Sequence, residues 1–243
     1  MKKEYVWSTF LLLIVWQGVS MSIHNADIFL PSVIDVMMRL VQDIQSENFL
    51  LHVGATLNKT LVSFIFALVL GVSFGIFSGI YKRIEMIFRP YELLLKAIPN
   101  ISYMFMLLLW VPKTSDAVYY IVFFILFPIF YTATLTGVRS LNQDLKDVLR
   151  LYDETLFVKI VKIYLPQSMS YIKGAILSGI SLGFKVCVMS EVLGSVRYGI
   201  GKAMYLNKIN LDMTGVFSWT IVIILMNFLL ENLSKIVMNK FDK

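Results

Sequence analysis

The chain has 243 residues, of which 58% are hydrophobic and 16% are charged, and its formal net charge is +6. Soluble domains are nearer half apolar and a quarter charged, so this composition favours a protein embedded in a membrane. The basic residues form no separate arm interleaved with aromatic side chains, which argues against a nucleic-acid partner.

Five stretches of the chain contain no Asp, Glu, Lys or Arg, namely 5–26, 61–81, 97–112, 117–138 and 213–230. Most of them approach or exceed the ~20 residues that span the hydrocarbon core of a bilayer. A sixth apolar stretch, 172–193, carries Lys173, Lys185 and Glu191. We therefore expect an all-α, polytopic membrane protein with six transmembrane helices, in which residues 1–243 form a single membrane domain.

The first apolar stretch has a second interpretation. Lys2 and Lys3 precede it and small residues follow near Ser20, which is also the order of a secretory signal peptide. The apolar run is long for a signal peptide and no clear A-x-A cleavage site follows it. A transmembrane helix is therefore the preferred prediction, with a cleaved signal as the alternative.

Small residues recur every four positions in the second and fifth apolar stretches. The first ladder consists of Ser63, Ala67, Gly71, Gly75 and Gly79. The second ladder consists of Ala175, Gly179, Gly183 and Cys187, with Glu191 next in the same row. Residues four apart share a helix face, and small side chains there let another helix approach closely in lipid. The ladders predict tight helix packing and leave open whether the partner helix belongs to the same subunit.

The third apolar stretch contains Pro99 close to its start. Proline removes a backbone hydrogen bond and frees the carbonyl four residues earlier, at about Leu95. Asn100, Ser102 and Tyr103 follow at once. A broken helix with polar groups beside it can line a cavity, so Asn100 and Tyr103 are candidates for a solute path. A kink that is satisfied by a local side chain is the structural alternative.

Two charges lie within the fifth apolar stretch, and each needs a partner or water because intramembrane charges are costly. Ser178 and Ser181 precede Lys185 by seven and four residues and share its helix face. Glu191 lies six residues further on, about 240° around the helix, so it cannot pair with Lys185 along one helix. Lys185 either lines a polar path or serves structure by snorkelling or by pairing with a buried carboxylate. For Glu191, near the outer end, a structural or gating hydrogen bond is slightly favoured.

A polar, helix-forming segment, DVLRLYDETLFVKIVKIYLP, separates the fourth and fifth apolar stretches and ends at Pro166. Such a segment must lie in water, where it can dock a soluble partner. If both termini are cytoplasmic, this segment and most Lys and Arg residues lie on the cytoplasmic side, as the positive-inside rule requires. The opposite side would then hold Arg39, Lys59, Lys113, Arg197, Lys202 and Lys208.

The sequence shows no catalytic apparatus and no metal site. It has no P-loop, no nucleophile elbow and no H-E-x-x-H motif. His24 and His52 have no cluster of ligands near them in the sequence, and Cys187 is the single cysteine. We therefore expect no enzymatic activity and no cofactor in this chain.

Several short motifs resemble the permease subunit of bacterial type I ABC importers, in the branch that takes up nitrate, sulfonates, taurine and thiamine precursors. They are Leu30-Pro31-Ser32 with Val36, Ala97-Ile98-Pro99, Lys185 with Glu191 and Gly194, and Gly199-Ile200-Gly201. The polar segment resembles the EAA loop of that family in its spacing to Leu165-Pro166. Its residues depart from the family pattern, since Asp147-Val148-Leu149 stands where Glu-Ala-Ala is typical. Asp153 stands in place of the family's glycine, and aspartate tolerates the left-handed turn at a cost of about 1 kcal/mol.

The resemblance implies a permease that pairs with a second copy of itself, as a homodimer, around a path for a small polar organic or anionic solute. An extracytoplasmic binding protein would deliver the solute, and separate ABC ATPase subunits would bind ATP and Mg²⁺. The ATPase would dock on a cytoplasmic coupling loop at about 139–170. The implied ATPase-coupling residues are Asp147, Arg150, Tyr152, Asp153, Glu154, Thr155, Phe157 and Lys159. The candidate path residues are Asn100, Tyr103, Ser178, Ser181, Lys185 and Glu191.

The same resemblance implies a multi-pass protein of the bacterial inner membrane with both termini in the cytoplasm. Two other classes of function stay open. An ion-coupled secondary transporter would carry its own ion site and often inverted repeats, and no repeat relates the two halves of the sequence. A membrane scaffold or coupling subunit would need the docking segment but no polar path, and Lys185 argues weakly against it.

Overall fold

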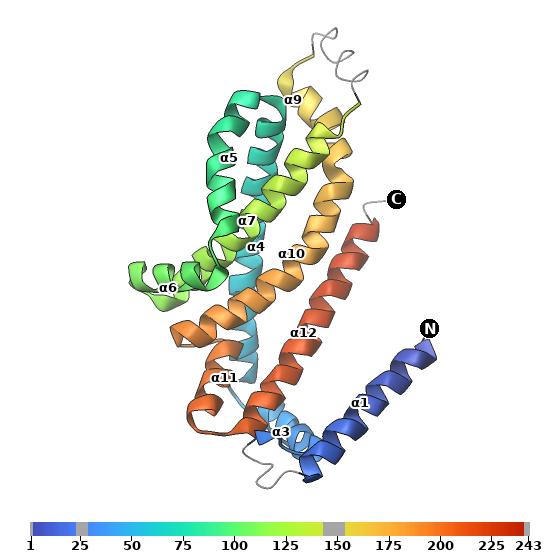
Figure 1. Ribbon diagram of the computed structural model, residues 1–243, viewed down its shortest axis with the longest axis vertical. Coiled ribbons are helices and arrows are strands. Elements are labelled where there is room, and N and C mark those ends of the chain that lie inside the picture. The colour runs from blue at the N-terminus through green and yellow to red at the C-terminus, as the bar shows by residue number, and fades with distance from the viewer. Residues whose placement is uncertain (1, 23–28, 143–153, 241–243) are drawn as a thin grey trace.

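The computed structural model describes residues 2–22, 29–142 and 154–240, and every regular element within them is helical (Figure 1). The elements in chain order are α1 (Lys2–Ser22), α3 (Val33–Gln45), α4 (Phe49–Ile80), α5 (Lys82–Ala97), α6 (Asn100–Trp110), α7 (Thr114–Arg139), α9 (Leu156–Lys159), a π-helical turn (Ile160–Tyr164), α10 (Leu165–Gly194), α11 (Ile200–Ile209) and α12 (Met213–Lys240). The expected all-α membrane fold is confirmed.

Four helical segments among the described residues are long and apolar enough to cross a membrane, namely Phe49–Ile80, Thr114–Arg139, Leu156–Gly194 and Met213–Lys240. A fifth span is obtained if α5 and α6, which meet at an angle of 100°, are counted as one broken span. The apolar part of α1, Phe10–Ser22, is shorter. The predicted number of six is therefore reached only when both the broken pair and α1 are included.

The first small-residue ladder packs α4 against α7. A Cβ atom added to Gly71 would lie 2.6 Å from Cβ of Phe130, and one added to Gly75 would lie 2.7 Å from Cβ of Thr134. The two helices run in the same direction, because residues further along α4 meet residues further along α7. Only glycine permits this close approach, so the ladder fixes the distance between α4 and α7.

The second ladder packs α10 against the same helix. A Cβ atom added to Gly183 would lie 2.9 Å from a methyl group of Leu126, and one added to Gly179 would lie 3.0 Å from the ring of Phe130. Helix α7 therefore packs against both α4 and α10, which also contact each other. The partner that the sequence left open is α7 of the same chain, and the hydrophobic core is built around it.

Pro99 marks the break between α5 and α6. Pro99 precedes the first residue of α6, and Ile98 has an extended backbone. The carbonyl oxygen of Leu95, which the proline was predicted to free, accepts a hydrogen bond of 2.5 Å from the Tyr103 hydroxyl. The chain thus satisfies the broken helix with a side chain from the next helix.

Different short helices lie at the two ends of the helix bundle. At one end, α9 lies beside the last turns of α4 and α7 and the first turn of α10, close to α5 (Figure 1). There the Arg139 guanidinium forms an ion pair with the buried Glu85 carboxylate, which joins α7 to α5. At the other end, α3 and α11 surround the first turns of α4 and α12. Candidate sites lie at both ends and along α10 between them.

Candidate functional site

Helix α10 presents two chemically different faces. Gly179, Gly183 and Cys187 are on its buried face. Lys185 and Ser178 are exposed on the other face, and Ser181 is partly exposed. Ser178, Ser181 and Lys185 therefore share one face of α10, as the sequence predicted. The described part of the chain does not cover that face.

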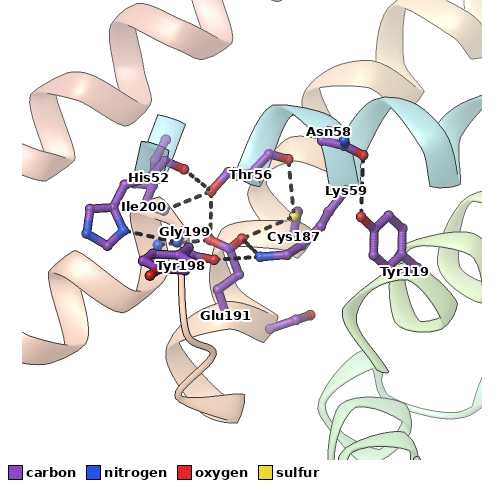
Figure 2. Close-up of polar contacts among 12 residues, drawn as sticks. His52, Thr56, Asn58, Lys59, Tyr119, Cys187, Glu191, Tyr198, Gly199 and Ile200 are labelled. Atoms are coloured by element: carbon purple, nitrogen blue, oxygen red, sulfur yellow. Dashed lines mark hydrogen bonds and ion pairs between the residues drawn. The ribbon is translucent and has the colours of Figure 1, made fainter. Parts of the chain in front are cut away.

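Glu191 lies at the end of the buried face and is completely inaccessible to solvent. Its Oε1 atom accepts a bond of 2.7 Å from the Lys59 ammonium of α4. Its Oε2 atom accepts bonds from the Thr56 hydroxyl at 2.8 Å and from the Gly201 amide at 3.0 Å. Figure 2 shows Thr56 and Lys59 of α4 meeting this carboxylate, with the Gly199 backbone beside it. Glu191 thus has the partner that Lys185 could not provide.

From the sequence alone, Lys59 was counted among the basic residues of the extracytoplasmic side and was given no partner. Helix α4 begins at Phe49, twelve residues before the charge-free stretch 61–81, so Lys59 lies within the helix. Its side chain is only 6% exposed. Its ammonium also donates a bond of 2.7 Å to the Tyr198 carbonyl oxygen. A signal was present in the sequence. Lys59 is four residues before Ser63, so it extends the first ladder just as Glu191 extends the second.

The segment between α10 and α11 closes over this ion pair. The Ile200 amide donates to the Thr56 hydroxyl at 2.8 Å, and the Gly199 amide donates to Nδ1 of His52 at 3.1 Å. Gly199 has φ of 155°, and a Cβ atom there would collide with the Glu191 carboxylate (Figure 2). Glycine is therefore required where the backbone lies directly against the buried charge.

We call the side chains of Lys59, Glu191 and Thr56 with the Gly199–Gly201 backbone the outer clamp, because this end of the bundle is extracytoplasmic in the predicted orientation. The bonds of this region join α4, α10 and the 198–201 segment, which leads into α11, to one another. A buried carboxylate with a paired ammonium and two further donors has its bonding needs met. The arrangement suits a rigid connection between helices. Among the described residues, no group of three or more His, Cys, Asp or Glu side chains is placed to hold a metal ion.

The remaining path candidates lie on α6. Asn100 is exposed at the start of that helix, whereas Tyr103 is 9% exposed and its hydroxyl is bonded to the α5 backbone. Among the described residues, no hydrogen bond joins either of them to Ser178, Ser181 or Lys185. The structure therefore gathers only the α10 candidates into one surface, and the hydroxyl of Tyr103 is occupied by the broken helix.

Part of the predicted coupling segment lies at the opposite end of the bundle from the outer clamp. Glu154, Thr155 and Phe157 are exposed there, with Phe157 74% exposed, and Lys159 is partly exposed. The Thr155 hydroxyl caps the first turn of α9 by accepting from the Val158 amide. The other four predicted coupling residues lie outside the described residues, namely Asp147, Arg150, Tyr152 and Asp153. An exposed phenylalanine on a short capped helix is suited to contact another protein.

Comparison with known proteins agrees with this architecture. Residues 60–243 match the model of the family described as binding-protein-dependent transport system inner membrane component. The putative aliphatic sulfonates transport permease protein SsuC of Bacillus subtilis is 25% identical over 91% of this chain and 83% of its own length. The taurine transport system permease protein TauC of Escherichia coli is 22% identical over 91% and 82%.

A solved structure of the MetNI methionine ABC transporter, in an inward facing conformation, resembles this fold. The TM-score is 0.67 at 16% sequence identity, over 81% of this chain and 99% of the solved chain. This likeness supports the type I importer permease fold. The family match covers well over half of the sequence. The chain therefore belongs to the family of binding-protein-dependent inner membrane transport components, and it is the permease subunit of an ABC transporter.

Proposed function

We propose that the exposed face of α10, with Ser178, Ser181 and Lys185, lines the path of a small solute that carries an anionic group. The observation that supports this most directly is the position of Lys185. Lys185 is exposed on a helix that qualifies as a membrane span, and the opposite face of that helix is buried.

An uncompensated cation at this position would be costly against lipid. Among the described side chains, no carboxylate lies within ion-pair distance of Lys185. Glu231 of α12 interacts electrostatically with Lys185 at longer range, but its ion-pair partner is Lys235 at 2.7 Å. Lys185 is therefore best accommodated if its face borders water, as a transport path does.

The names of the relatives favour the same chemistry. SsuC and TauC are described as permeases for aliphatic sulfonates and for taurine. A sulfonate is a fixed anion, and an ammonium surrounded by hydroxyl groups attracts it by charge and by hydrogen bonds. We therefore propose a small sulfonate or a similar organic anion as the solute class for this chain.

The proposed assembly follows from the two ends of the bundle. A second copy of the chain would face α10 and complete the path. ABC ATPase subunits, which bind ATP and Mg²⁺, would dock at Glu154, Phe157 and the rest of the 139–170 segment, so that ATP hydrolysis takes place outside this chain. An extracytoplasmic binding protein would deliver solute at the end formed by α3 and α11.

The solute class is tested by uptake into proteoliposomes that contain this chain, its cognate ATPase and its binding protein. Labelled taurine, an alkanesulfonate, a neutral amino acid and an organic cation form the panel. We expect uptake of the sulfonates, and about tenfold weaker uptake in Lys185→Met, because a hydrogen bond to a charged group contributes about 1.5–3 kcal/mol. Lys240→Met, at the end of α12, is the control. Preferential uptake of the cation, or unchanged uptake by Lys185→Met, contradicts the proposal.

The proposed orientation has a separate test. If both termini are cytoplasmic, α11 lies outside the cell, because α12 runs from α11 towards the C-terminus. A cysteine in place of the exposed Lys208 should react with an impermeant thiol reagent in intact cells. The native Cys187 is buried, so it gives a silent background. Labelling that requires permeabilised cells contradicts this orientation.

A further inference from the structure

A groove of about 570 Å³ lies between α4 and α7, and its lining includes no residue of the outer clamp or of α10. Five of its lining side chains are aromatic and one is a carboxylate. The lining residues are Val62, Ser63, Phe66, Asp116, Tyr119, Tyr120, Phe123 and Phe124. Neither the coupling segment nor the proposed solute path uses these residues.

The ladder that draws α4 and α7 together also creates this groove. At its floor, the Ser63 hydroxyl donates to the Tyr119 carbonyl oxygen at 2.9 Å, so the two backbones are close. Large side chains flank that contact, including Phe66 of α4 and Tyr120 of α7, which are 61% and 51% exposed. Two helices in close contact with bulky flanking side chains leave a channel along their seam.

The groove changes character along its length. Asp116 is in the first turn of α7, and the Tyr119 hydroxyl donates to Asn58 at 3.3 Å near the same end (Figure 2). Phe124 lies eight residues further along α7, which is about 12 Å deeper into the span. Phe66 and Val62 of α4 are also in the deeper part. The groove is thus polar at the end of the span and apolar within it.

Asp116 lacks a partner at the polar end. Among the described residues, no Lys, Arg or His lies within ion-pair distance of its carboxylate. Tyr119 is close enough to interact with that carboxylate electrostatically. A carboxylate in the first turn of a helix is favourable by only about 0.3–1 kcal/mol. That effect explains why a carboxylate is tolerated at position 116, but it does not explain why aromatic side chains line the groove beside it. A negative charge beside aromatic side chains is an environment that attracts an organic cation.

We propose that this groove binds a membrane phospholipid whose headgroup carries a primary amine, such as an ethanolamine phospholipid. The ammonium group lies between Asp116 and the tyrosine rings, and an acyl chain follows Val62, Phe66 and Phe124. The lipid is favoured over a soluble amine because all lining residues below the rim are apolar apart from Ser63, whose hydroxyl is already bonded. This site is independent of the proposed solute and of the path along α10.

The test measures phospholipid retained on the purified permease–ATPase complex by native mass spectrometry. The complex is reconstituted with defined mixtures of ethanolamine and glycerol phospholipids before mild delipidation. We compare the original chain with Asp116→Asn and with Tyr120→Leu, which keeps an apolar side chain but removes the ring. Matched controls are Glu47→Gln, another exposed carboxylate, and Tyr171→Leu, a 42% exposed tyrosine on α10.

We expect the original complex to retain the ethanolamine lipid in preference to the glycerol lipid. Each groove variant should lower that preference about three- to tenfold, since an ion pair or cation–π contact contributes about 1 kcal/mol. The controls should retain it. Thermal unfolding in lipid-free detergent should be the same for Asp116→Asn and Glu47→Gln, which separates lost binding from misfolding.

Three outcomes overturn the proposal. Equal retention of both lipids by all variants shows that the groove does not recognise an amine headgroup. Displacement of the lipid by free ethanolamine at comparable concentration shows that the ligand is a soluble amine. A change in the mass of the assembly that follows Asp116→Asn, with no change in lipid, shows that the groove is a contact with a second copy.

Discussion

Helix α10 carries two intramembrane charges, and the structure treats them in opposite ways. Glu191 is fully buried and accepts bonds from an ammonium, a hydroxyl and a backbone amide. Lys185, six residues earlier, is exposed and has no carboxylate at ion-pair distance among the described side chains. The comparison teaches that an intramembrane charge should be interpreted by its helix face rather than by its depth.

The physical reason is the cost of desolvation. A charge on a buried face must have its bonds supplied by the protein, so its partners are fixed and its role is structural. A charge on an open face keeps its bonding capacity for water or for a ligand. Glu191 therefore belongs to the outer clamp, whereas the solute path is the role that we propose for Lys185. The experiments below are ordered by the loss of stability that each should cause.

Removing one partner of the outer clamp should have the largest effect. Lys59→Met leaves the Glu191 carboxylate buried and unpaired, which costs about 3–5 kcal/mol of stability. The double variant Lys59→Met with Glu191→Leu should regain most of that loss, because it removes both charges. Thermal unfolding of the purified complex measures both. If the double variant is no more stable than the single one, the buried ion pair is not the source of the loss.

A methyl group added at the contact between α7 and α10 should destabilise the protein, whereas one added on the exposed face of α10 should not. A Cβ atom on Gly137 of α7 would lie 2.7 Å from the Ser168 backbone, so Gly137→Ala should force α7 and α10 apart at a cost of about 1–3 kcal/mol. Gly174 is on the exposed face of α10, and no atom lies within 4 Å of an added Cβ. Gly174→Ala should therefore be neutral or stabilising by about 0.5–1 kcal/mol. Equal losses in both variants would contradict the packing described here.

The sequence predicted the elements that depend on local pattern. The ladders predicted close packing, because a four-residue repeat of small side chains has one main use in lipid. Pro99 predicted the break and the free Leu95 carbonyl, because proline acts on the adjacent backbone. The family resemblance rested on motifs whose order is kept from Leu30 to Gly201.

The outer clamp could not be predicted in the same way, since it joins residues more than 130 positions apart. Lys59 was counted with the basic residues of the extracytoplasmic side because the charge-free stretch, taken as the span, begins two residues after it. The length of α4 was the missing information. The identity of α7 as the shared partner of both ladders was also absent from the sequence, because α7 has few small residues to mark it.

Changes at the α9 end should leave stability unaltered and still abolish transport. Glu154 and Phe157 are exposed, so replacing both with alanine removes no buried contact. We expect the variant to assemble and unfold like the original chain while ATP hydrolysis no longer drives uptake. Normal uptake in proteoliposomes would show that the ATPase docks elsewhere.

The central claim, that the Lys185 face borders the solute path, is tested most directly by chemical rescue. Lys185→Cys should keep normal stability and lose uptake of the anion identified by the solute panel. Aminoethyl methanethiosulfonate, which restores a positive charge at the thiol, should restore uptake, and the anionic sulfonatoethyl reagent should not. The buried Cys187 should not react. Unchanged uptake in Lys185→Cys, or the same response to both reagents, would contradict the claim.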